Sequence, residues 1–244
     1  MFAAVVSPAA AQFHVAQPDV VKGQGQVADH TAVYAGPGSE EQLVQGHDVE
    51  LTYGLTDRLA FLTMGLFQEP IGEPLEAKFY DIGGQIELIE RHGNGLGFAF
   101  RSLYKFALQD GSPDEVLFGP IGRIVSGRLS ATVDTFFVQD FGGGGNLALD
   151  IKWQLRRGIS ERASLGIEGY GTISNLAAPG TFAEQEHRLG PVLYLKLGPW
   201  TAKEVRDSAG VGEEEIFGFS IGALFGLTEA TSDAAFKFNL SGVF

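Results

Sequence analysis

Histidines are the residues of this chain whose type best suits acid–base or metal chemistry, because cysteine is absent. Imidazole serves as a general base beside a nucleophile, or as a metal ligand when other ligands stand at a suitable spacing. No serine lies at a sequence spacing from a histidine that would indicate a hydrolase motif. No metal-ligand motif, phosphate-binding loop or dinucleotide fingerprint occurs either. The sequence therefore predicts no enzyme, no cofactor and no metal site. The five histidines are His14, His30, His47, His92 and His187.

Charged residues are the second group whose side chains could take part in binding or catalysis. Many of them alternate with apolar residues along the chain. In the stretch NLALDIKWQLR, Asp150 and Lys152 stand between Leu149, Ile151 and Trp153. Alternation with a period of two is typical of a strand that has one apolar and one polar face. The pattern recurs up to the end of the chain, FKFNLSGVF.

Segments of this kind predict about twelve strands of roughly 9–14 residues each. Strands of soluble proteins average about five or six residues, whereas a tilted strand that crosses a bilayer needs about 9–11. We therefore expect an all-β, up-and-down antiparallel transmembrane β-barrel of about 12 strands, formed by residues 13–244 as a single domain, with a first strand from about Asp19 to Tyr34. The alternative is a soluble β-protein whose apolar faces form a core.

The connections between the expected strands alternate between short turns and longer loops rich in glycine, proline and acidic residues. This asymmetry is expected of a barrel with two different ends. Residues 198–215 break the rule, because they form a long connection on the side of the short turns. Thr201 and Glu204 have capping-box spacing, so this stretch is interpreted either as a short helix or as a disordered excursion.

If the apolar faces meet lipid, the polar faces line the lumen. Their charges have mixed signs. This pattern indicates ion pairs that brace a narrow lumen, and it argues against a pathway selective for ions of one sign. Whether these charges only fill the interior or line a selective pathway stays open at this stage. The predicted lumen residues are Asp48, Glu50, Asp81, Glu87, Arg101, Lys105, Arg123, Asp134, Asp150, Lys152, Glu168, Arg188, Lys196 and Lys237.

Overall charge and the first residues narrow the function classes further. The formal net charge of −13 leaves no basic surface for nucleic acid. Residues 1–12, MFAAVVSPAAAQ, end in small residues of the kind that precede signal-peptidase cleavage, and indicate either the remnant of an export signal or a disordered leader. His14 is expected to belong to that leader.

The terminus FKFNLSGVF resembles the C-terminal signature of Gram-negative outer-membrane β-barrels, and YGLTDRLAF and RGISERASL resemble hairpin turns of small porin-like barrels. The resemblance implies an integral location in the outer membrane, both termini in the periplasm, and contact with lipid and lipopolysaccharide. It also implies that the barrel-assembly machinery reads the last strand, with Phe236, Phe238, Leu240 and Phe244 as the assembly signal.

Three functions remain after the sequence analysis. The first is a porin-like channel for the passive diffusion of small solutes. The second is a closed barrel that acts as a structural or partner-binding subunit of an envelope complex, with residues 198–215 as a contact for a periplasmic partner. The third and weakest is a lipid-modifying barrel hydrolase that uses His47 or His187.

Overall fold

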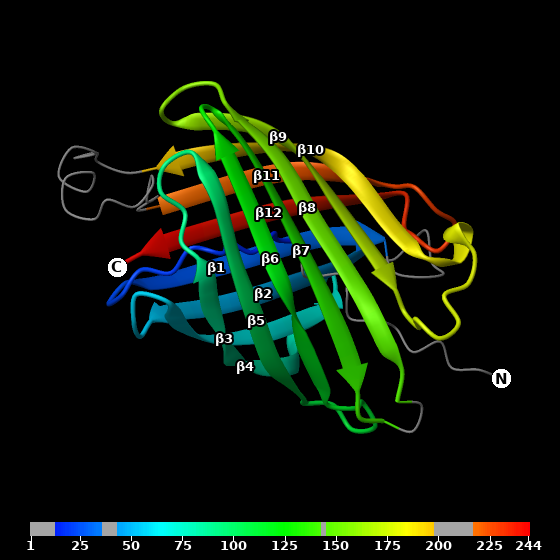
Figure 1. Cartoon of the computed structure of the whole chain (residues 1–244). Helices are drawn as coiled ribbons and strands as arrows, with labels where there is room; N and C mark the ends of the chain where they lie inside the picture. Colours follow the sequence, from blue (N-terminus) through cyan, green and yellow to red (C-terminus); the bar gives the residue numbers. More distant parts are fainter. Residues whose placement is uncertain (1–12, 36–42, 143–144, 198–216) are drawn as a thin grey trace.

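The computed structural model describes residues 13–35, 43–142, 145–197 and 217–244, and in this part of the chain twelve antiparallel strands close into one barrel (Figure 1). The predicted fold class and strand number are therefore confirmed. A turn of 3-10 helix, η2 (Phe182–Glu184), lies between the ninth and tenth strands. The strands are β1 (Gly25–Ala35), β2 (Leu43–Gly54), β3 (Leu59–Pro70), β4 (Glu76–Ile89), β5 (Gly95–Ala107), β6 (Glu115–Ser126), β7 (Leu129–Asp140), β8 (Leu147–Gly158), β9 (Ala163–Ile173), β10 (Glu186–Leu197), β11 (Phe217–Gly226) and β12 (Ala234–Val243).

The barrel closes where the first strand pairs with the last. The β1–β12 ladder runs from the pair Gln26–Val243 to the pair Tyr34–Ala235. Beyond it, the backbones of Gly25 and Phe244 exchange two hydrogen bonds of 2.8 Å each. Closure leaves no sheet edge, which is the condition for a β-sheet to cross a bilayer.

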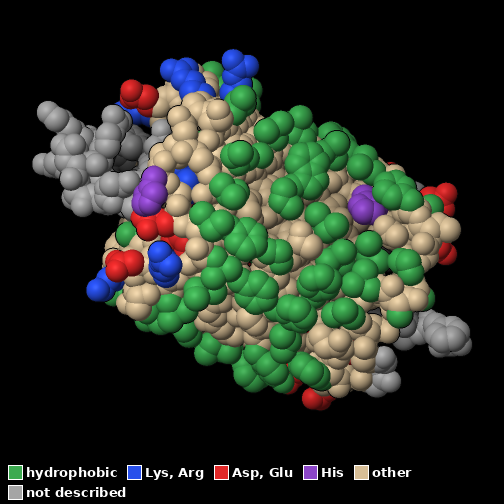
Figure 2. Space-filling model, in the orientation of Figure 1, with side chains coloured by type: hydrophobic (Ala, Val, Ile, Leu, Met, Phe, Trp, Pro, Cys, Tyr) green, Lys and Arg blue, Asp and Glu red, His purple; other side chains and the backbone are tan. Residues whose placement is uncertain are grey.

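The outward face of the barrel is apolar, and the strands of 10–14 residues are long enough to cross a bilayer. In β8, for example, Trp153 and Leu155 are exposed, whereas Lys152 and Gln154 between them are buried. Figure 2 shows apolar side chains over most of the barrel face in view, with charged side chains gathered towards the ends. The described residues include no helix that is long and apolar enough to span a membrane.

The two ends of the barrel differ in the length of their connections. Short turns join β2 to β3, β4 to β5, β6 to β7 and β8 to β9, at the end where β1 begins and β12 ends. Gly127 in the β6–β7 turn has φ of 58°, a left-handed conformation that favours glycine. The longer connections, such as that from β9 to β10, lie at the opposite end. Residues 198–215, where we predicted a helix or an excursion, lie outside the described residues.

The expected start of the first strand at Asp19 is wrong, because β1 begins at Gly25. Residues 13–22, here called the lumen segment, have no regular secondary structure and pass through the inside of the barrel. The prediction that His14 lies in a disordered leader is also wrong, since only 9% of its surface is exposed. A Cβ atom on Gly54 would lie 1.9 Å from the carbonyl oxygen of Val21, so the wall leaves room here for backbone only.

Two titratable side chains stand in the middle of the outward face. Nδ1 of His47 on β2 lies 3.4 Å from Oδ1 of Asp29 on β1 and 3.0 Å from Oγ1 of Thr31. The neighbouring outward residues Val49 and Leu51 are apolar and exposed. A polar pair in an apolar belt costs free energy wherever lipid covers it.

We predict that the double substitution Asp29→Leu and His47→Leu stabilises the barrel in lipid vesicles by roughly 1–2 kcal/mol, because it removes polar groups from the lipid-facing belt. Urea unfolding followed by tryptophan fluorescence measures the change. Thr135→Leu, at an outward and uncharged position of β7, is the control. A loss of stability in the double variant would contradict the assignment of this surface to lipid.

Candidate functional site

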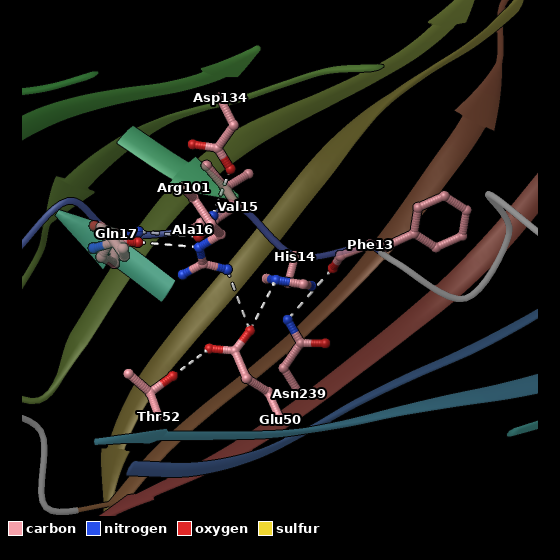
Figure 3. Close-up of polar contacts among 11 residues, drawn as sticks. Phe13, His14, Val15, Ala16, Gln17, Glu50, Thr52, Arg101, Asp134 and Asn239 are labelled. Carbon is pink, nitrogen blue, oxygen red and sulfur yellow. Dashed lines mark hydrogen bonds and ion pairs between the residues drawn. The ribbon is translucent and has the colours of Figure 1, made fainter. Parts of the chain in front are cut away.

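The lumen segment is held by hydrogen bonds between its own backbone and charged side chains of the wall. The amide of Ala16 donates to Oδ2 of Asp134 at 2.6 Å (Figure 3). The amide of Val20 donates to Oε2 of Glu87 at 3.1 Å. Asp134 on β7 is fully buried. An unpaired backbone amide costs free energy inside a protein. These carboxylates accept the backbone hydrogen bonds that the carbonyl groups of a neighbouring strand would otherwise accept.

Gln85 of β4 supports the middle of the segment. Its Nε2 donates to the carbonyl oxygens of Gln17 at 3.0 Å and Pro18 at 3.1 Å. Its Oε1 accepts a hydrogen bond of 3.0 Å from Nε of Arg101 on β5. One amide thus connects the segment to a buried cation of the wall.

Asp19 fixes the end of the segment that lies near the short turns. Its carboxylate lies 3.3 Å from Nε of Arg91, in the β4–β5 connection, and 3.1 Å from Nη1 of Arg123 on β6. Arg91 is buried and the other two side chains are largely shielded. Ion pairs away from bulk water are stronger than those on a surface, so this clamp contributes to the position of the segment.

Phe13 occupies the other end of the segment. Its ring packs edge-on against Tyr170, with centroids 5.2 Å apart, and the guanidinium of Arg188 lies 5.2 Å from its centroid. A small pocket lies beside Phe13 and is also lined by Asp150 and Lys152. Phe13 therefore lines a small pocket near the long loops.

His14 joins the segment to the first two strands. Its ring stacks on that of His30, with centroids 4.0 Å apart and planes inclined by 9°. Its Nε2 lies 3.6 Å from Oε2 of Glu50, the oxygen that also lies 3.4 Å from Nη1 of Arg101. Thr52 donates a hydrogen bond of 2.8 Å to the other oxygen of Glu50 (Figure 3).

Glu168 is the centre of a second network, which crosses the lumen between strands that are not neighbours. Nζ of Lys237 on β12 and the hydroxyl of Tyr170 both donate to Oε2 of this β9 carboxylate. The hydroxyl of Tyr194 donates to its Oε1 at 2.5 Å. Lys237 also donates to the hydroxyl of Tyr170 at 3.0 Å, so every polar atom of this buried group has a partner.

The structure places the predicted lumen residues inside the barrel and brings several of them together. Ion pairs join Glu50 to Arg101 and Glu168 to Lys237. Lys105 pairs instead with Glu115, its register partner on β6, at 3.3 Å. The buried members are Asp48, Glu50, Asp81, Glu87, Arg101, Lys105, Asp134, Lys152, Glu168, Arg188 and Lys237, and the partly buried ones are Arg123, Asp150 and Lys196.

The path of the lumen segment through the barrel was not predicted from the sequence. A usable signal was present, because Phe13, Ala16 and Val20 are apolar residues beside Pro18, which disfavours a central strand. The meeting of His14, His30 and Glu50 was not predicted either: one ligand atom from each lies within 4.8 Å of the others.

Among the described residues, neither histidine proposed for hydrolysis has the contacts of a catalytic triad. His47 contacts both Thr31 and Asp29 through the same nitrogen, Nδ1. A serine-hydrolase triad needs its nucleophile and its acid on opposite ring nitrogens. His187 stacks on Phe182, and its Nε2 contacts Oε1 of Gln185 at 3.0 Å.

No family model matches the chain, and no curated protein matches its sequence. Among solved structures, an outer membrane channel from Pseudomonas putida F1 is similar, with a TM-score of 0.60 and 10% identity over 96% of this chain and 100% of that chain. Omp33 of Acinetobacter baumannii aligns with a TM-score of 0.49 and 10% identity over 91% of this chain and 99% of that chain. The first likeness shows that this chain has the fold of an outer-membrane β-barrel.

We predict that Lys237→Met lowers the free energy of unfolding by about 3–5 kcal/mol, because it leaves the Glu168 carboxylate buried without its cation. Adding Glu168→Gln to this variant removes the uncompensated charge and is expected to restore much of the loss. Urea unfolding of the wild type and of the single and double variants measures both effects. Equal stability of the single variant and the wild type would contradict the assigned role of the pair.

Proposed function

We propose that this protein is an outer-membrane channel for small polar solutes, and that the lumen segment closes it. One observation carries the proposal: residues 13–22 fill the lumen but belong to no strand of the barrel. Their polar contacts with the wall are hydrogen bonds and ion pairs, which water can replace. Phe13, Ala16 and Val20 also pack against apolar side chains of the wall, so departure of the segment costs free energy by exposing them. Because the segment belongs to no strand of the barrel, its departure leaves the closed sheet intact.

The lumen behind the segment has the character of a passage for small hydrophilic molecules. Asp150, Lys152 and Arg188 line the pocket near the long loops, so acidic and basic groups stand side by side. A pore for anions alone is expected to have one dominant basic track. The mixed lining supports passive diffusion of neutral or zwitterionic solutes.

The orientation in the membrane follows from the asymmetry of the two ends. We place the short turns and the β1 and β12 ends in the periplasm, and the longer loops and the surrounding lipopolysaccharide outside. Phe236, Phe238 and Leu240 alternate with buried Lys237 on β12 and are exposed, as a recognition signal for the assembly machinery requires. Phe244, which is 72% exposed, is the last residue of this proposed signal.

We propose that residues 13–244 form one barrel domain. Residues 1–12, for which the sequence predicts either the remnant of an export signal or a disordered leader, lie outside the described residues. The proposed partner contact at 198–215 also lies there.

A permanently closed barrel is the second candidate, and the filled lumen favours it. The Glu168–Lys237 pair and the Asp19 clamp brace the interior. A structural subunit of an envelope complex needs such bracing and no passage. The following cross-link separates the two functions.

We predict that a disulfide between the substitutions Pro18→Cys and Gly97→Cys locks the channel shut. A Cβ atom at position 97 would lie 3.3 Å from Cγ of Pro18, and the chain has no other cysteine. Planar-bilayer recordings are expected to show baseline current when the pair is oxidised and a several-fold higher conductance after reduction. The single-cysteine variants are the controls, and mass spectrometry after alkylation reports whether the disulfide forms. A reduced channel that stays silent would favour the closed-barrel candidate.

We predict that Asp19→Asn raises the open probability several-fold, because it removes the charge that Arg91 and Arg123 bind. Single-channel recording measures the change. Asp57→Asn, at an exposed position of the β2–β3 turn, is the matched control and is expected to behave like the wild type. If Asp19→Asn gates like the wild type while the cross-link still controls conductance, other contacts hold the segment.

A further inference from the structure

Three side chains from separate parts of the chain meet in the lumen with the composition of a metal site. His14 comes from the lumen segment, His30 from β1 and Glu50 from β2. One ligand atom from each lies within 4.8 Å of the other two. His14 Nε2 and Glu50 Oε2 are 3.6 Å apart (Figure 3).

The two imidazoles have unused coordination capacity. Nδ1 of His14 and Nδ1 of His30 are both buried, and neither has a hydrogen-bond partner within the part of the chain that the structure describes. Buried polar atoms are nearly always satisfied in proteins, so an unsatisfied nitrogen on each ring points to a ligand. One ion takes a single nitrogen from each ring, and for His14 this is either Nδ1 or Nε2.

The donor set selects the class of ion. Two imidazole nitrogens and one carboxylate suit zinc and related first-row transition metals, whereas calcium and magnesium prefer all-oxygen sites. We propose that His14, His30 and Glu50 bind one zinc-class transition-metal ion. Metal–ligand distances of about 2.0–2.2 Å bring ligand atoms to roughly 3–4 Å from one another. Because an ion lies in the plane of each imidazole that binds it, the rings of His14 and His30 must rotate out of their stacked arrangement to complete the site.

The surrounding charges set the balance for a bound cation. Arg101 contacts Glu50 and competes with the ion for the same oxygen. Lys152 and Lys237 are further cations that act on His14. Asp48, the register partner of His30 on β2, has the opposite effect and favours a bound cation. Its carboxylate is 1% exposed and has no hydrogen-bond partner among the described residues. The ion adds positive charge beside this unpaired carboxylate.

The site joins the lumen segment to the wall. His14 is the ligand from the segment, and the other two ligands belong to strands that stay in the barrel. A bound ion therefore holds the segment inside the lumen and favours the closed state. This consequence for conductance rests on the proposed channel function, whereas the metal site itself does not.

Zinc binding tests the site directly, with the refolded full chain after treatment with a chelator. Isothermal titration with zinc chloride is expected to show one ion per chain, and calcium chloride is expected to show no binding. His30→Gln is expected to weaken zinc binding at least about 100-fold, more than the loss of an outer-shell partner does. His47→Ala is the matched control, because His47 also lies beside a carboxylate, that of Asp29, but outside the lumen.

The outcomes separate the metal site from the channel. The absence of zinc binding to the wild type, or binding that His47→Ala removes and His30→Gln does not, overturns the site. Heat-modifiable mobility on a gel shows that each variant is folded. In planar bilayers, zinc is expected to lower the conductance of the wild type several-fold and to leave His30→Gln unchanged. If zinc binds but does not lower the conductance, the proposed link between zinc binding and channel closure is overturned. If the wild type shows no conductance with or without zinc, the result counts against the proposed channel function.

Discussion

The pairing of β1 with β12 closes the sheet, and the separation of the chain into an outside and an inside follows from it. A sheet with free edges cannot remain in hydrocarbon, and here the closing ladder extends to the backbone hydrogen bonds between Gly25 and Phe244. Once the sheet is closed, the two-residue period of every strand divides the chain into an apolar outside and an enclosed inside. The charged residues between the apolar ones therefore share one narrow space, where each needs a partner.

The lumen segment supplies partners that the wall lacks. The carboxylates of Asp134 and Glu87 accept backbone amides of the segment, and Asp19 brings a negative charge to Arg91 and Arg123. The segment and the wall are therefore electrostatically complementary. This complementarity explains why a stretch without strand pairing is ordered inside the barrel. In the proposed channel, water can satisfy the same polar groups when the segment leaves.

The sequence was sufficient to predict the strands and their two faces, but not the side-chain contacts inside the barrel. Period two is a local property, and long strands repeat it many times, so β8 could be predicted from its own residues. The pair of Glu168 and Lys237 depends instead on the radius of the closed barrel, since β9 and β12 are not neighbours. The path of the lumen segment could not be predicted for a related reason: Pro18 argues against a strand, but the side chains that bury Phe13, Ala16 and Val20 come from distant strands.

The cluster of His14, His30 and Glu50 shows how such a non-local arrangement couples binding to conformation. His30 and Glu50 belong to paired strands and so stay together, whereas in the proposed channel His14 is near them only while the segment occupies the lumen. On that proposal, a ligand held by all three side chains binds the closed state more tightly than the open one. By linkage, that ligand then favours closure by the same factor by which closure strengthens its binding. The wall alone, with one imidazole and one carboxylate, offers too few ligands to do the same.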